Sequence, residues 1–225
     1  MPEVTKRIHR VDGVNANPYL VIEDGGTVTL VDTGIPPDGK KILAYLAGFG
    51  KKPEDVSNMV ITHSHIDHIR GAARLKSATG AKVGVHEADA DYLSGKKKFK
   101  AAGAMGILFA VISPLFSVTP VEPDVRLKEG DMVGRLRVIH TPGHTPGSAA
   151  FFDEAERALF VGDTVRYIDG KLVGPPPNFT VDMQQAKASM TRLSKLDFRI
   201  LLSGHGDPLV ADDAAKQVGE LAEKL

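Results

Sequence analysis

Short apolar runs rich in Val, Ile, Leu and Phe recur along this chain, and most are bounded by Gly, Pro, Asp or Ser. Runs of this kind are typical of β-strands that are buried in a folded domain. The stretch 19–34 contains two of them, joined by a turn at Asp24-Gly25-Gly26. Further strands are predicted at 56–62, 81–86, 133–140, 148–152, 157–162 and 198–204.

Other segments show the spacing of three and four that places apolar residues on one face of a helix. Ile42, Leu43, Leu46 and Phe49 follow this spacing, and Gly50 marks the end of the helix. Further helices are predicted after Asp67, over 87–93, over about 181–196 and from about residue 211. Strands and helices therefore alternate, and no linker divides them, which predicts one α/β domain over residues 1–225.

The stretch 101–121 contains no charged residue and follows the basic run 96–100. It is long enough to cross a bilayer, but its glycines and prolines make it weakly apolar for a transmembrane helix. We therefore predict that 94–120 forms a lid or pocket insertion, in which Phe109 is a candidate substrate contact. A contact between the subunits of a homodimer and a membrane-surface anchor are the alternatives.

Charge and cysteine content narrow the class of protein. The 28 basic and 28 acidic residues cancel, so the chain has no basic surplus that would attract nucleic acid, and a small-molecule substrate is favoured. The absence of cysteine excludes disulfides, a thiol nucleophile and thiolate metal ligands. The first ten residues lack the apolar region of a secretory signal, so a cytoplasmic location is expected.

Residues 61–73, ITHSHIDHIRGAA, place three histidines and an aspartate between His63 and His68. His63 and His65 are two positions apart, so an extended segment would point both to one side, and a helix begins around Asp67. Imidazoles and a carboxylate suit Zn²⁺ or a similar cation. A solvated histidine-rich loop is the alternative, and spacing alone does not decide between them.

Three later strands also end in a side chain that can bind metal. His144 lies in the loop TPGHTPGS, Asp163 follows the strand LFVG, and His205 follows the strand ILLSG. Each is flanked by glycine, proline or threonine, which favour a sharp turn at that point. This repeated placement favours one metal centre assembled from separate strand ends.

With these motifs together, the chain resembles the metallo-β-lactamase-fold hydrolase superfamily. THSHIDH corresponds to the family motif T-H-x-H-x-D-H, and TPGHTPGS, FVGDT and SGHGD follow in the family order, after LVDTG at 30–34. The resemblance covers roughly residues 18–206 and implies a four-layer αββα sandwich with the metals at one edge of the two sheets.

The resemblance also implies roles for individual residues. The first metal would be held by His63, His65 and His144, the second by Asp67, His68 and His205, with Asp163 bridging the two. Asp67 would additionally act as the catalytic residue that moves a proton toward the leaving group. Asp32 would support the ligands without binding metal.

The implied activity is cleavage of a carboxylic ester, thioester or lactone by a hydroxide that two divalent cations activate. Zn²⁺ is the expected metal, with Fe and Mn as alternatives. Tyr167 and Phe179 are candidate substrate contacts, although hairpin packing is the favoured interpretation for Tyr167. A phosphoester hydrolase, a mononuclear iron dioxygenase and a catalytically silent binding protein are the competing hypotheses.

The three remaining histidines are assigned simpler roles. His9 is predicted to lie on the surface, and His86 is predicted to pack at the end of its strand. His140 is predicted to form a local hydrogen bond.

Overall fold

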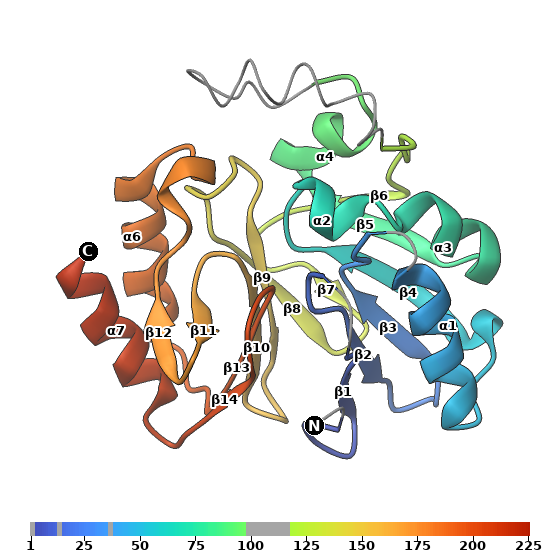
Figure 1. Cartoon of the computed structure of the whole chain (residues 1–225), viewed down its shortest axis with the longest axis horizontal. Helices are drawn as coiled ribbons and strands as arrows, with labels where there is room; N and C mark the ends of the chain where they lie inside the picture. Colours follow the sequence, from blue (N-terminus) through green and yellow to red (C-terminus); the bar gives the residue numbers. More distant parts are fainter. Residues whose placement is uncertain (1–2, 13–14, 36–37, 98–117) are drawn as a thin grey trace.

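A computed structural model of the chain describes residues 3–12, 15–35, 38–97 and 118–225. Two six-stranded sheets lie face to face in this part of the chain, and helices cover the outer side of each sheet (Figure 1). The predicted four-layer αββα sandwich is therefore confirmed.

The first sheet is built from the N-terminal half of the chain, in the order β1-β2-β3-β4-β5-β6. Its first three strands are antiparallel, and β3 to β6 run parallel to one another. The strands are β1 (Ile8–Arg10), β2 (Tyr19–Ile22), β3 (Val28–Val31), β4 (Val56–Ile61), β5 (Lys82–His86) and β6 (Val125–Leu127). The parallel strands are connected through α1 (Asp38–Gly48), the short 3-10 helix η1 (Pro53–Asp55), α2 (Ile66–Ile69), α3 (Ala72–Thr79) and α4 (Glu87–Leu93).

The second sheet is built from the C-terminal half, in the order β14-β13-β10-β9-β8-β7. Only β10 and β13 pair in parallel; the other neighbours are antiparallel. The strands are β7 (Met132–Val133), β8 (Leu136–His140), β9 (Ala149–Asp153), β10 (Ala158–Gly162), β13 (Ile200–Ser203) and β14 (Leu209–Val210). The second sheet is covered by the helices α6 (Met183–Leu193) and α7 (Ala214–Lys224). A separate hairpin is formed by β11 (Arg166–Ile168) and β12 (Lys171–Val173), and the 3-10 helix η3 (Pro177–Phe179) follows it.

Sequence patterns located the longer elements but not the short ones. The hairpin predicted over 19–34 is present, with Tyr19 opposite Val31. The single strand predicted over 133–140 is wrong, because Gly134 takes a positive φ of 56° and reverses the chain between β7 and β8. The short strands β6, β11, β12 and β14 had no predicted counterpart, since two or three residues are too few to show a period.

Three hydrophobic clusters fill the spaces between the four layers. Along β2, Leu20 faces the cluster beneath the N-terminal helices, whereas Tyr19 and Val21 face the cluster between the two sheets. Along β9, Phe151 faces the cluster between the sheets, whereas Phe152 faces the cluster beneath α6 and α7. Because side chains alternate along a strand, strands that are buried on both faces read as the continuous apolar runs seen in the sequence.

The predicted 94–120 lid and the predicted surface position of His9 have different outcomes. Residues 98–117, which include Phe109 and most of the predicted 94–120 lid, lie outside the described residues. Among the described helices, none combines the length and the hydropathy that crossing a bilayer requires. The surface prediction for His9 is wrong: it is 8% exposed, its ring stacks on Phe49, and its Nδ1 lies 3.1 Å from the Tyr45 hydroxyl, because α1 covers this part of the sheet.

Candidate metal centre

The residues predicted to bind metal gather where strands of both sheets end. His63 follows β4, Asp163 follows β10 and His205 follows β13, while the loop between β8 and β9 carries His144. The short helix α2 carries Asp67 and His68, and it lies with α4 at the same end of the sandwich (Figure 1). The fold therefore brings together residues that are up to 142 positions apart in the sequence, from His63 to His205.

Three groups of side chains are close enough to hold a cation. The potential ligand atoms in each group lie within 4.8 Å of one another. The groups are His63, His65 and His144; His63, His68 and Asp163; and Asp67, His68 and His205. The first and third match the two ligand sets that the resemblance implies, and Asp163 enters through the second.

Asp163 lies between the other members of the centre. One of its carboxylate oxygens is 3.6 Å from His68 Nε2, and the other is 3.9 Å from His144 Nε2 and 3.5 Å from His205 Nε2. These separations are too long for hydrogen bonds but leave space for a cation on either side of the carboxylate. Asp67 lies nearby, with Oδ2 at 3.1 Å from His205 Nε2.

The unpaired atoms of the centre provide a test of whether the residues fit a metal. Among the described residues, six buried side-chain nitrogen or oxygen atoms lack a hydrogen-bond partner within the protein. Four of them belong to the centre: the Nε2 atoms of His63, His68 and His144, and Oδ1 of Asp163. Leaving buried polar atoms unpaired is unfavourable, and cations bound at the two ligand groups would satisfy all four. The donor set, imidazole and carboxylate, also suits a divalent transition metal.

Asp32 controls the orientation of two of these imidazoles. Its Oδ2 accepts hydrogen bonds from His68 Nδ1, at 2.8 Å, and from the Thr62 hydroxyl, at 2.7 Å. Because the Thr62 hydroxyl has only one hydrogen, its oxygen accepts from His63 Nδ1, at 3.1 Å. The Nδ1 atoms of His63 and His68 therefore carry hydrogen, and their Nε2 atoms face the centre. Each Nε2 atom can bind a cation, once any proton on it has been released. Asp32 thus contacts a predicted ligand while belonging to none of the three ligand groups.

Thr180 plays the same part for His144. Its hydroxyl donates to the carbonyl oxygen of Pro176 at 2.8 Å, so its oxygen accepts from His144 Nδ1 at 3.1 Å. The Nε2 atom of His144 is thereby left without hydrogen and available to a cation. The stiff proline-rich loop 174–180 thus fixes the orientation of a predicted ligand.

Burial and neighbouring charges shift the pKa values of the centre. Burial, reinforced by the surrounding histidines, lowers the pKa of His63 far below its usual value and that of His144 to about 3. Burial would also lower the pKa of His68, but the charges of Asp32 and Asp163 raise it well above the usual range. Burial opposes ionisation of Asp67, but His205 and His68 lower its pKa. The centre therefore holds ionised carboxylates and mostly neutral imidazoles, the states in which these groups bind metal.

The backbone conformation at Asp32 and the lack of a side chain at Gly204 both shape the centre. Asp32 adopts a φ of +60°, which is uncommon for a residue other than glycine and is held here by its hydrogen bonds. At Gly204, a Cβ atom would lie 2.5 Å from His68 Cε1 and 2.6 Å from Asp163 Oδ1. A side chain at this position would therefore collide with the predicted ligands.

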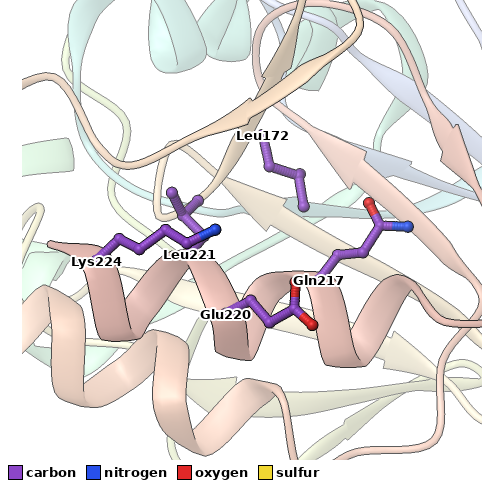
Figure 2. A pocket seen from close by; sticks show the side chains of 5 residues that line it. All are labelled: Leu172, Gln217, Glu220, Leu221 and Lys224. Atoms are coloured by element: carbon purple, nitrogen blue, oxygen red, sulfur yellow. The ribbon is translucent and has the colours of Figure 1, made fainter.

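The two candidate substrate contacts in the described residues, Tyr167 and Phe179, differ in exposure. Tyr167 lies in β11, half-buried, and packs against the hydrophobic cluster beneath α6 and α7, which agrees with the favoured hairpin interpretation. Phe179 is 48% exposed and precedes Thr180, the partner of His144. Figure 2 shows a pocket between β12 and α7 that is lined by Leu172, Gln217, Glu220, Leu221 and Lys224, and none of these is a predicted site residue.

Sequence reasoning missed three supporting residues. Thr62 lies in the histidine motif, Thr180 follows the candidate substrate contact Phe179, and Asp89 lies in the helix predicted over 87–93, but none of the three is assigned a role by its pattern. Thr62 and Thr180 contact predicted ligands, and Asp89 contacts the loops that carry them. No pattern in a single sequence distinguishes these from ordinary capping or surface residues.

Comparisons with known proteins agree with this geometry. The model of the metallo-beta-lactamase superfamily matches residues 11–205. A probable metallo-hydrolase of Bacillus subtilis, YflN, is 27% identical over 244 residues, covering 99% of this chain and 92% of that protein. The human acyl-coenzyme A thioesterase MBLAC2 is 30% identical, covering 72% of this chain and 61% of that protein. The crystal structure of TTHA1623 in a di-iron-bound form matches with a TM-score of 0.72 and 27% identity, covering 93% of this chain and 97% of that one.

Proposed function

The chain belongs to the metallo-beta-lactamase superfamily and is a hydrolase of that superfamily, and from this premise we propose that it cleaves a carboxylic ester, thioester or lactone with two bound divalent cations. The observation that carries the proposal is the pair of separate three-residue ligand groups with Asp163 lying between them. A centre for a single cation would require only one of these groups.

We assign His63, His65 and His144 to one cation and Asp67, His68 and His205 to the other, with Asp163 shared. Two such cations, when bound, lower the pKa of water and polarise the substrate carbonyl, so the protein needs no serine or cysteine nucleophile. The protein's own contribution is to keep a hydrogen on the Nδ1 atom of each imidazole, through Asp32, Thr62 and Thr180, so that Nε2 faces the centre.

Asp67 is the residue that we propose moves a proton in the reaction. Its side chain is 34% exposed, more than that of the buried Asp163, so a substrate can reach it. Its lowered pKa keeps the carboxylate ionised, which is the state that can accept a proton.

Apolar side chains beside the centre favour a substrate with an acyl group. Phe179 and Val181 are 48% and 63% exposed, and they flank Thr180, whose hydroxyl contacts His144. Exposed apolar side chains next to a polar centre are typical of pockets that bind the non-reacting part of a substrate. The thioesterase name of MBLAC2 supports the same class of substrate.

The direct test is a hydrolysis screen of the purified, metal-loaded protein against a panel of aliphatic lactones, acyl thioesters, carboxylic esters and phosphoesters. We expect turnover of at least one acyl substrate and little turnover of the phosphoesters. The variant His65→Ala serves as the blank, because it removes a ligand of one proposed cation and leaves the other group intact.

The same preparations decide between the competing hypotheses. Two equivalents of metal per chain and no oxygen consumption are expected for the proposed hydrolase. One equivalent of iron with oxygen uptake would identify a dioxygenase instead, and turnover of phosphoesters alone would overturn the proposed substrate class.

A further inference from the structure

A carboxylate on α4 is buried directly behind the candidate metal centre and belongs to none of its three ligand groups. Asp89 is completely buried, although it lies on a helix of seven residues whose next aspartate, Asp91, is accessible. Burying a carboxylate is unfavourable unless hydrogen bonds compensate it. The partners of Asp89 therefore indicate what this carboxylate does.

Asp89 accepts hydrogen bonds from the two loops that carry the first ligand group. Its Oδ2 accepts from the backbone N–H of Ser64, at 2.9 Å, and from the Thr145 hydroxyl, at 2.8 Å. Its Oδ1 accepts from the backbone N–H of Gly147, at 2.7 Å. Ser64 separates His63 from His65, and Thr145 directly follows His144.

These two loops come from different sheets. Ser64 lies beyond the end of β4 in the first sheet, and Thr145 lies between β8 and β9 in the second. The ring centres of His65 and His144 are 4.5 Å apart, so their separation depends on how the two loops are held together. Asp89 is a single carboxylate that bonds to both loops.

The local chain is shaped to admit this contact. A Cβ atom at Gly147 would lie 2.4 Å from the backbone nitrogen of Asp89 and 2.6 Å from its Cβ, so no other residue fits there without displacement. Ser148 completes the network, because its hydroxyl accepts from the Thr145 N–H at 2.9 Å and lies 2.8 Å from the Thr145 hydroxyl. The backbone packing and the hydrogen bonds are independent signs that the His144 loop is seated on Asp89.

We propose that Asp89 is a positioning residue for the first ligand group, and that it sets the spacing of His65 and His144 by holding their loops on one carboxylate. The inference rests on the proposed function, since it concerns one of the two proposed cations. It predicts a selective effect: loss of the Asp89 carboxylate weakens the first cation site and spares the second, because the second group, Asp67, His68 and His205, lies outside the segments that Asp89 holds at Ser64, Thr145 and Gly147.

The test is a competition titration of the metal-free protein with Zn²⁺ against a chelating indicator. The variants His65→Ala and His205→Ala identify which binding step belongs to which group. Asp89→Asn is nearly isosteric, but whichever way the amide turns, its N–H₂ group faces the N–H of Ser64 or of Gly147, so at least one of the three hydrogen bonds is replaced by a clash of donors. We expect it to weaken the step that His65→Ala removes by about tenfold or more, as is typical for residues that orient ligands.

Two further variants separate positioning from general damage. Asp91→Asn, on the same helix, removes a half-buried carboxylate that pairs with Lys97 and Arg126, and it is expected to leave both binding steps unchanged. Thr145→Val removes only one of the bonds to Asp89, so it is expected to weaken the same step to a smaller degree even if Asp89→Asn folds poorly. Circular dichroism of each metal-free variant reports whether it is folded.

The possible results are distinct. A wild-type protein that takes up no metal would overturn the proposed function itself. If the wild type binds metal normally but Asp89→Asn and Thr145→Val leave the first step unchanged, the positioning role is refuted and the proposed function stands. Equal weakening of both steps in a folded variant would likewise refute the selective role.

Discussion

At the scale of the residue, the metal centre depends on hydrogen bonds to the Nδ1 atoms of its histidines, which point away from the centre. His63, His68 and His144 each present Nε2 to the centre, and their Nδ1 atoms are held by Thr62, Asp32 and Thr180 respectively. Each imidazole thereby keeps a hydrogen on Nδ1 and is held in one orientation before any cation binds. Removing one of these partners should therefore affect metal binding without removing a ligand.

Thr62→Val provides a test of this arrangement. The substitution keeps the volume but leaves His63 Nδ1 and Asp32 Oδ2 without one of their buried partners. We expect the affinity for Zn²⁺ to fall by about 10- to 100-fold, measured by competition with a chelating indicator.

Thr29→Val is the matched control for this measurement. Thr29 is equally buried, on β3, and its hydroxyl bonds to Glu23 and to no residue of the centre. It should lower stability but leave the metal affinity as in the wild type. Equal Zn²⁺ affinities in Thr62→Val and the wild type would show that the hydrogen bonds of the Thr62 hydroxyl to Asp32 and His63 do not contribute to metal binding.

At the scale of the element, α2 is a single helical turn that carries Asp67 and His68, and its position depends on the contacts at its end. Gly71, between α2 and α3, donates its N–H to the carbonyl of Gly34, and a Cβ atom there would lie 2.4 Å from the carbonyl oxygen of Thr33. Thr33 in turn bonds to the backbone of His68 through its N–H, at 2.9 Å, and its hydroxyl, at 2.6 Å. The absence of a side chain at Gly71 thus lets α2 sit close to the end of β3.

Gly71→Ala should therefore disturb both stability and the second ligand group. Because backbone, not a flexible side chain, opposes the added methyl group, we expect a loss of about 1–3 kcal/mol in the free energy of unfolding. The shift of α2 should also weaken the binding step that His205→Ala removes. Chemical denaturation and the Zn²⁺ titration measure the two effects.

Gly48→Ala is the corresponding control, since Gly48 ends α1 and a Cβ atom there would meet nothing within 4 Å. Alanine has the higher helix propensity, so stability should change by no more than about 1 kcal/mol, in the favourable direction. If Gly71→Ala behaved like Gly48→Ala, close packing of α2 against Thr33 would not matter.

At the scale of the whole molecule, the two sheets are joined both by their shared hydrophobic cluster and by contacts at their edges. Tyr19 of the first sheet packs edge-on against Phe160 of the second, with ring centres 5.4 Å apart, and its hydroxyl donates to the carbonyl of Ser203 at 2.8 Å. His86, at the end of β5, stacks on His140, at the end of β8, with ring centres 3.8 Å apart. His140 Nε2 also lies 2.9 Å from the carbonyl of Pro146, which agrees with the local bond predicted for it.

The His86 stack should make the metal-free protein sensitive to acid. Burial, followed by the neighbouring His140, lowers the pKa of His86 below its ordinary value of 6.5. The unfolded chain therefore binds more protons below pH 6.5, so stability falls as the pH drops from there toward the pKa of the folded state. No such loss arises from His86 above that pH.

The variant His86→Asn isolates this contribution. Asparagine cannot titrate in this range, yet it can accept the helix-capping bond from the Ala88 N–H that His86 Nδ1 accepts now. We expect denaturation midpoints to fall less steeply between pH 7 and 5 in the variant than in the wild type, both metal-free. Parallel pH profiles would contradict a buried neutral His86.

Much of this protein could be read from local sequence. The apolar runs located β4, β9 and β10, and the helical spacing of Ile42, Leu43, Leu46 and Phe49 located α1, because these signals depend only on neighbouring residues. The histidine motif and the three later strand ends indicated a metal centre. The surface prediction for His9 failed, because its burial depends on a helix that lies more than 25 residues away in the chain, at Asp38–Gly48.

By itself, the sequence determined where the longer strands and helices lie and which side chains are able to bind metal, since both properties are carried by short stretches of chain. The tertiary structure alone decided how closely His144, Asp163 and His205 approach the early histidines, because packing of the two sheets sets the spacing of these distant strand ends. It also decided that Asp89, unremarkable on its helix, is buried between two ligand loops, since only the complete fold supplies its three hydrogen-bond donors.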